Sequence, residues 1–214
     1  MIITKRYKIS DLLDSYDDIT ARLEGIERHT EKFGPKVCWK ITDETITRHS
    51  VKIIQNSIKE ISPTHLKVAL ADLANQIDQA HKFSLVHGDL NWKNILQIDY
   101  QFKIIDWEPS LRQSIFKKQR LMGTRPYIHP SDDISNILTQ KTDLFGFFVF
   151  CMFHLSAANY GVAFNKTTLK IAIKNSLLRQ GYVVADFIEN CPNSERLLEK
   201  IFHNLHYWTS EFIA

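Results

Sequence analysis

Three side chains that could support phosphoryl transfer lie close together in the sequence, at Asp89, Asn94 and Asp106. Asp89 stands five residues before Asn94, and Asp106 follows Asn94 by twelve residues. Phosphoryl transfer needs one carboxylate that orients the attacking hydroxyl group and two oxygen ligands that hold Mg²⁺ on the nucleotide phosphates. This spacing supplies all three groups, between apolar stretches that can bury the backbone around them.

The residues after Asn94 predict a short β-hairpin that brings two of these groups together. Ile95-Leu96 and Phe102 to Ile105 are apolar and favour two short strands, with a turn from Gln97 to Gln101 between them. Such a hairpin would carry Asn94 and Asp106 to the same end, where one metal ion could contact both.

The run from Val86 to Leu96, VHGDLNWKNIL, resembles the catalytic loop of the protein-kinase-like superfamily. In that superfamily the loop reads His-x-Asp with an Asn five residues after the Asp, and the metal-binding motif is Asp-Phe-Gly. The segment from Asp106 to Glu108 reads DWE instead. The Gly after the His, together with DWE, is more similar to the aminoglycoside and choline phosphotransferase branch.

The resemblance implies a role for each residue of this block. Asp89 is similar to the catalytic base, Asn94 and Asp106 are similar to the Mg²⁺ ligands, and ATP and Mg²⁺ are the implied cofactors. His87 is similar to a structural histidine that packs beneath the loop.

A second block is similar to the end of a protein-kinase activation segment. Gly123 to Pro130 reads GTRPYIHP, and Thr142 to Gly146 looks like the start of the large buried helix that follows. The resemblance implies that Asp143 is a buried carboxylate that accepts hydrogen bonds from the catalytic-loop backbone. The chain departs from the protein-kinase pattern at Ser131, where a Glu is expected, and at Asn91, where a Lys is usual.

The remaining sequence predicts a strand, a helix and a hairpin before the catalytic loop, and helices after it. The expected elements are a strand at 1–8, a helix from Ser10 or Asp11 to about Lys32 that Gly34-Pro35 ends, strands at 37–41 and 45–51, a short helix at 53–61, a longer helix from Ser62-Pro63, and helices from Asp143 onward.

This order resembles a kinase N-lobe that begins at its third strand. We therefore expect an α+β, protein-kinase-like two-lobed fold, with a reduced N-lobe at 1–51 that lacks the Gly-rich loop and a mainly helical C-lobe at 52–214. A loop that covers the ATP phosphates excludes water and fixes the γ-phosphate. Without it, ATP should bind weakly, or a partner protein or a second copy of the chain should complete the nucleotide site.

The third strand of the superfamily carries a Lys that contacts the phosphates and pairs with a Glu on the next helix. Lys5 is the best match for this Lys, and Glu24 is its expected partner, with Glu27 second. Alternatively, Lys5 is a solvated terminal charge. A rival register places the Lys at Lys40, but leaves no residues for the hairpin before the helix at Pro63.

The segment after the metal motif is basic, which suits an acidic or phosphorylated substrate or, equally, a solvated face. Its cations are Arg112, Lys117, Lys118 and Arg120, and its phosphorylatable hydroxyl groups are Ser110, Ser114, Thr124 and Tyr127.

Composition limits the other possibilities. The hydrophobic content of 44% supports a packed core, and a net charge of only +3 gives no indication of a nucleic-acid partner. Cys38, Cys151 and Cys191 are far apart and lack metal-ligand spacing, so we expect core thiols and a cytoplasmic location. The apolar stretch at 144–164 is about as long as a membrane span, but polar residues such as His154 interrupt it, so we expect no span.

The sequence thus predicts an ATP- and Mg²⁺-dependent phosphotransferase, with Ser/Thr residues of a protein substrate as the preferred acceptors. One alternative is a kinase of a sugar, a lipopolysaccharide or an antibiotic. A second is a pseudokinase that binds partners without catalysis, and AMP transfer on the same fold is a weaker third.

Overall fold

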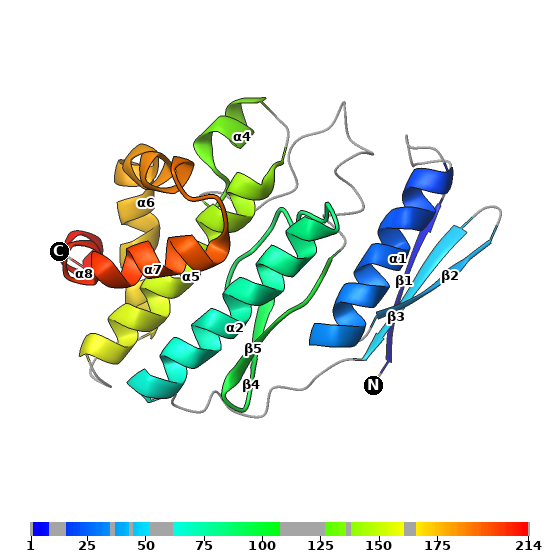
Figure 1. Ribbon diagram of the computed structural model, residues 1–214, viewed down its shortest axis with the longest axis horizontal. Coiled ribbons are helices and arrows are strands. Elements are labelled where there is room, and N and C mark those ends of the chain that lie inside the picture. The colour runs from blue at the N-terminus through cyan, green and yellow to red at the C-terminus, as the bar shows by residue number, and fades with distance from the viewer. Residues whose placement is uncertain are drawn as a thin grey trace.

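The computed structural model describes residues 2–8, 16–34, 37–42, 45–51, 62–107, 127–135, 138–160 and 166–213. In these ranges helices predominate, beside a three-stranded antiparallel sheet and a separate two-stranded one. Figure 1 shows the three-stranded sheet and one helix at one side of the molecule and the remaining helices at the other. The α+β class predicted from the sequence is therefore confirmed.

The three-stranded sheet has the strand order β1-β3-β2. Strand β1 spans Ile2–Lys8, β2 spans Val37–Ile41 and β3 spans Thr45–Val51. Strands β2 and β3 form the predicted hairpin, and Thr42 closes its turn through a hydrogen bond of 2.9 Å from its backbone N–H to the carbonyl oxygen of Thr45. The β-branched residues of both strands favour this pairing.

Helix α1, Tyr16–Phe33, lies against this sheet. Its apolar face is as expected, because Ile19, Leu23 and Ile26 are all buried. The helix ends at Gly34, whose φ of 50° lies in the left-handed region that glycine adopts without a steric penalty. The predicted start at Ser10 or Asp11 lies outside the described residues.

Helix α2, Pro63–Lys82, begins where the sequence predicted. The side chain of Ser62 caps it by accepting a hydrogen bond from the backbone N–H of His65, and Pro63 occupies the first turn, where its missing N–H costs nothing. The predicted apolar face is confirmed, since its five residues are buried: Leu66, Leu70, Leu73, Ile77 and Ala80. The predicted short helix at 53–61 lies outside the described residues.

Strands β4, Ile95–Ile98, and β5, Gln101–Ile104, form the second hairpin. The predicted turn from Gln97 to Gln101 was too long, because Ile98 pairs with Gln101 and only two residues connect the strands. The amide of Gln97 donates to the carbonyl oxygen of Asp99 in this turn, which satisfies a polar side chain that is nearly buried. Asp99 has a φ of 52°.

Five further helices follow in the described chain: α4, Pro130–Ser135; α5, Gln140–Tyr160; α6, Lys166–Glu189; α7, Ser194–His203; and α8, Leu205–Ile213. Helices were predicted from Asp143 onward, whereas the short helix α4 was not predicted. Helix α5 is the axis of this part, since every residue from 142 to 153 is buried. Among the described helices, none combines the length and the apolar character that crossing a membrane requires.

Helices α2 and α7 are joined by a carboxylate. The side chain of Asp78 on α2 accepts hydrogen bonds from the backbone N–H groups of Ser194, at 2.7 Å, and Glu195, at 3.2 Å. These N–H groups have no partner within their own helix, and a negative charge there also favours the helix dipole. Asp78 therefore stabilises the start of a helix more than a hundred residues away.

Candidate functional site

The loop that carries Asp89 is anchored by Asp143. The carboxylate of Asp143 accepts hydrogen bonds from the backbone N–H groups of His87, at 2.8 Å, and Gly88, at 2.7 Å. Nε2 of His81 lies 3.0 Å from the same carboxylate. Asp143 is almost completely buried, so these donors replace its lost hydration. The prediction of a buried, hydrogen-bonded Asp143 is confirmed.

Helix α5 also touches the loop through Gly146. A Cβ atom at this position would overlap the carbonyl oxygen of Leu90 and would lie 2.8 Å from the Cβ atom of Leu90. The absence of a side chain therefore lets the loop backbone approach the helix closely.

His87 is fully buried, and its two neighbours determine its tautomer. Nδ1 accepts a hydrogen bond from the backbone N–H of Asp89, at 3.2 Å, and Nε2 lies 2.8 Å from the carbonyl oxygen of Ile105. A carbonyl oxygen can only accept, so Nε2 carries the proton. His87 thus joins the loop to the end of β5, which confirms its predicted structural role.

Beneath the loop, three aromatic rings stack edge to face. The Trp107 ring lies 5.0 Å from that of His87 and 4.8 Å from that of His29 on α1, measured between centroids. All three side chains are buried. Burial, followed by the nearby His87, Lys32 and His81, lowers the pKa of His29 to about 4. The imidazole of His29 is therefore neutral at physiological pH.

The side chain of Asp89 is held by two asparagines. The amide nitrogen of Asn94 donates to Oδ2 of Asp89, at 2.9 Å, and that of Asn91 donates to Oδ1, at 3.0 Å. Both amides also donate to the backbone carbonyl oxygen of Asp89. Asn91, which departs from the protein-kinase pattern, in turn accepts a hydrogen bond of 2.8 Å from the backbone N–H of Lys93. The carboxylate of Asp89 is thus fixed in orientation.

The second hairpin brings Asn94 and Asp106 to one end, as predicted. Ile95 pairs with Ile104 at the end of the hairpin. Beyond this pair, the backbone N–H of Ile105 donates a hydrogen bond of 2.9 Å to the carbonyl oxygen of Asn94. Asp106 follows directly and has a φ of 65°, a conformation that Asp tolerates better than most residues. One carboxylate and one amide therefore flank the end of the hairpin.

These two residues suit a hard cation in their chemistry. Carboxylate and amide oxygens are ligands that Mg²⁺ prefers, and protein sites for Mg²⁺ commonly supply only one or two of them. The amide nitrogen of Asn94 faces Asp89, and its Oδ1 accepts no hydrogen bond from the described residues. The described part of the chain contains no group of three or more His, Cys, Asp or Glu side chains that could hold a metal ion.

The predicted pair of Lys5 and Glu24 stays a prediction. Lys5 lies on β1, where it pairs with Arg48 of β3, but its side chain is outside what the structure describes. Glu24 lies on the exposed side of α1, and its carboxylate is 4.0 Å from the guanidinium of Arg28. The alternative partner, Glu27, lies on the same helix and is partly buried.

The segment from 108 to 126 is outside the described residues, including its four cations and the hydroxyl groups of Ser110, Ser114 and Thr124. Tyr127 is described. It is buried, its ring lies 5.0 Å from that of Trp92 in the loop, and burial raises its pKa to about 12. Tyr127 therefore packs as a core aromatic residue, which disfavours it as a phosphorylation site.

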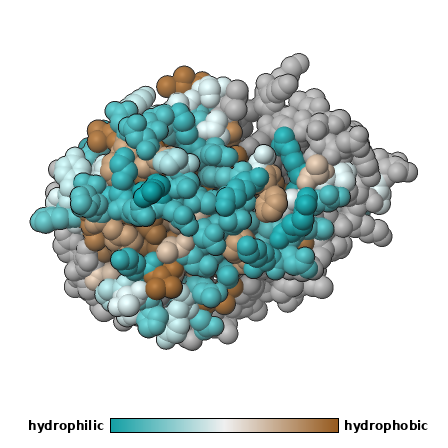
Figure 2. Space-filling view, viewed as in Figure 1, coloured by the Kyte–Doolittle hydropathy of each residue, from teal (hydrophilic) through white to brown (hydrophobic). Residues whose placement is uncertain are grey.

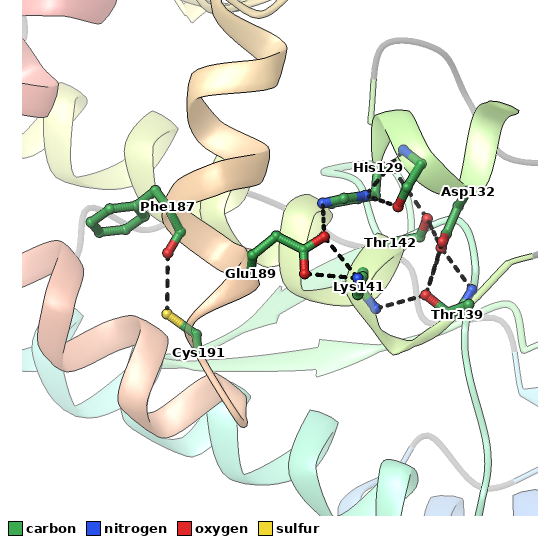
Figure 3. A network of polar contacts seen from close by, with 9 residues as sticks. His129, Asp132, Thr139, Lys141, Thr142, Phe187, Glu189 and Cys191 are labelled. Atoms are coloured by element: carbon green, nitrogen blue, oxygen red, sulfur yellow. Dashed lines mark hydrogen bonds and ion pairs between the residues drawn. The ribbon is translucent and has the colours of Figure 1, made fainter.

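A polar network fixes the segment between Tyr127 and α5 (Figure 3). Asp132 accepts hydrogen bonds from the hydroxyl groups of Thr139, at 2.8 Å, and Thr142, also at 2.8 Å. The hydroxyl of Thr142 in turn accepts from the backbone N–H of His129, at 3.2 Å, while the hydroxyl of Ser131 lies 2.7 Å from Nδ1 of His129. Ser131, the second departure from the pattern, thus serves this network.

The network reaches α6 through an ion pair. Nζ of Lys141 lies 2.7 Å and 2.8 Å from the two carboxylate oxygens of Glu189, and these contacts hold the pKa of Glu189 below its usual range. Nε2 of His129 lies 3.9 Å from the same carboxylate, and burial lowers the pKa of His129. The segment next to the loop is therefore tied to two helices.

Sequence reasoning missed His81 and His29. Both are histidines on helices with apolar faces, and nothing near them in the sequence indicates their partners, which are Asp143 and Trp107. Neither family models nor curated proteins yielded a match to this chain.

Proposed function

We propose that this protein is an ATP- and Mg²⁺-dependent phosphotransferase with a protein-kinase-like, two-lobed fold. The single observation that carries the proposal is the joint placement of Asp89, Asn94 and Asp106. The side-chain amides of Asn91 and Asn94 orient the carboxylate of Asp89. Asn94 directly precedes the second hairpin, and Asp106 follows it. The anchoring of this loop by Asp143 agrees with the resemblance that first suggested the activity.

Each residue has a distinct task in the proposed reaction. Asp89 would orient the hydroxyl group of the acceptor and take up its proton, while Asn94 and Asp106 would hold Mg²⁺ through oxygen atoms. Bound Mg²⁺ would neutralise the charge that develops on the phosphates. Lys5, paired with Glu24, would add a positive charge beside the same phosphates. Residues 1–51 would form the reduced N-lobe, and 52–214 the C-lobe.

The order of elements supports the fold part of the proposal. A strand, a helix and a hairpin precede the loop, and all three strands form one sheet with β3 in the centre. The 214 residues contain only seven glycines and no glycine-rich phosphate loop. A partner protein or a second copy would then cover the phosphates.

The preferred acceptor is a Ser or Thr residue of a protein. Tyr127 to Pro130 leads into α4, and the polar network around Asp132 fixes this segment beside the loop. The activation segment that this part of the chain resembles is typical of protein kinases and not of small-molecule kinases.

A small hydroxyl compound is the second candidate acceptor, and Gly88 favours it. The φ of Gly88 is 77°, so the residue between His87 and Asp89 must adopt a conformation that strongly favours glycine. His-Gly-Asp is the form that resembles small-molecule phosphotransferases.

Labelled ATP provides the test. Purified protein with γ-labelled ATP and Mg²⁺ should transfer label to a protein, to a small hydroxyl compound or to itself, and mass spectrometry should identify phosphate rather than AMP on the product. Asp89→Asn should abolish the transfer, whereas Asp99→Asn, in the exposed turn of the hairpin, should retain it. No transfer to a broad panel of proteins and small compounds would favour a pseudokinase.

A further inference from the structure

Helix α6 presents an exposed apolar face to solvent. One side of the helix packs into the core through Ile173, Leu177, Val184 and Ile188, all of which are buried. Other positions of the helix expose large hydrophobic residues instead, namely Ile171, Leu178, Tyr182 and Val183, and the first three of these share one face. The surface of the helical part in Figure 2 is mainly hydrophilic, with separate hydrophobic patches. Four such residues on one helix are therefore a candidate interface.

Four exposed residues on this face follow one another at intervals of four: Lys174, Leu178, Tyr182 and Asp186. Residues four apart on a helix are neighbours on one face. Leu178 and Tyr182, at the centre of this stripe, are 68% and 70% exposed. A cation stands at one end of the stripe and an anion at the other, and neither has an ion pair among the described residues.

The stripe on one copy of the chain is complementary to the stripe on a second copy that runs in the opposite direction. In two antiparallel copies related by a two-fold axis near residue 180, Leu178 of each copy faces Tyr182 of the other. Lys174 of each copy then faces Asp186 of the other, so that both ion pairs form at once. A two-fold interface requires this kind of self-complementarity, because the same patch serves on both sides.

We propose that α6 is a homodimer interface, in which a second copy of this chain packs antiparallel against the stripe. Burial of Leu178 and Tyr182 would supply most of the affinity, because exposed ion pairs contribute little by themselves. The two ion pairs would instead select the antiparallel register, since a parallel arrangement would place like charges together.

The proposed interface is separate from the candidate functional site. Helix α5 contacts both α2 and α6 and lies between α6 and the second hairpin (Figure 1). The dimer would therefore leave the end of the hairpin at Asn94 open. The proposed interface does not depend on whether the chain transfers phosphate.

Charge reversal gives a sharp test in the full chain. Sedimentation velocity between about 1 and 200 μM should show a dimer, with a dissociation constant that Lys174→Glu or Asp186→Lys raises about tenfold or more. Each variant alone would place like charges opposite each other. An equimolar mixture of the two should dimerise again, because in a mixed dimer the introduced glutamate faces the introduced lysine, and the native Lys174 of one copy faces the native Asp186 of the other.

Lys82→Glu is the matched control, since it makes the same charge change at an exposed position on α2 and should leave the dimer intact. Circular dichroism melting of each variant should show an unchanged fold, as expected for exposed side chains. Three results would each overturn the proposal: a wild-type chain that stays monomeric at about 200 μM, single variants that dimerise as the wild type does, or a mixture that remains as monomeric as its components.

Discussion

A hydrogen bond of 2.7 Å joins the backbone N–H of Gly88 to the carboxylate of Asp143, across 55 positions of the sequence. The same carboxylate also accepts a hydrogen bond from the backbone N–H of His87, and it lies 3.0 Å from Nε2 of His81. The buried helix α5 thus holds the loop in place from below, one residue away from Asp89. Rigid support of this kind is what a precisely oriented carboxylate requires.

We expect Asp143→Ala to destabilise the protein by about 3 kcal/mol or more, because it leaves buried backbone donors without an acceptor. Thermal and urea denaturation should detect the loss. Glu199→Ala is the control, since its exposed ion pair with Arg196 contributes little to stability. An unchanged melting curve for Asp143→Ala would contradict the anchoring role.

Gly146→Ala tests the close approach of α5 and the loop. The added methyl group would overlap the backbone of Leu90, so we expect a loss of about 1 to 3 kcal/mol, together with lower transfer activity. Gly25→Ala on α1 is the matched control, because its Cβ atom would lie at an ordinary 3.5 Å from Leu85. This control should be neutral or stabilising, since alanine favours helices. Equal behaviour of the two variants would refute the steric explanation.

Asp89 and Asp106 should differ in their effects on nucleotide binding. Asp89→Asn should abolish phosphate transfer but retain most of the affinity for Mg²⁺-ATP, since the proposed base is not a metal ligand. Asp106→Asn should weaken binding as well, because the proposed oxygen ligand loses its charge. Isothermal titration of both variants with Mg²⁺-ATP checks the difference. An equal loss of affinity would rule out this division of tasks.

His29 should make the protein less stable in acid. Its pKa of about 4 in the folded state lies below the usual 6.5, so the unfolded chain binds the proton more readily between these values. The free energy of unfolding should therefore decrease as the pH falls from 6.5 to 4, by at most about 3 kcal/mol from this residue.

Urea denaturation at several pH values should show that His29→Phe reduces this decrease. His129, whose pKa is also lowered, contributes in the same direction and remains in the variant. Identical pH profiles for wild type and His29→Phe would show that the imidazole is not shielded from protons.

Local sequence patterns predicted an element correctly where neighbouring residues determine its bounds. The Ser62-Pro63 start of α2 was right because the cap and the first-turn proline act within four residues. The turn between β4 and β5 was predicted too long, because Gln97 and Gln101 are polar residues that nevertheless lie in strands. In the structure the side-chain amide of Gln97 donates a hydrogen bond to the carbonyl oxygen of Asp99, a contact that the strand pattern alone does not reveal.

The candidate site was predictable in its chemistry, and the resemblance also implied the supporting roles of Asp143 and His87. The spacing of Asp89, Asn94 and Asp106 indicated which residues the hairpin would bring together. The contact between Gly146 and Leu90 could not be predicted, because a glycine inside a helix looks unfavourable until its neighbour is known. The same holds for His81, whose partner lies 62 positions away.

The carboxylate of Asp78 has a consequence for the synthesis of the protein on the ribosome. Its partner, the N–H of Ser194, lies 116 positions further along the chain, which corresponds to roughly ten seconds of translation. During this interval α2 lacks its native contacts with α7. Ribosome-bound chains that stop before residue 194 should therefore recruit chaperones, and chains in which α7 has emerged should release them.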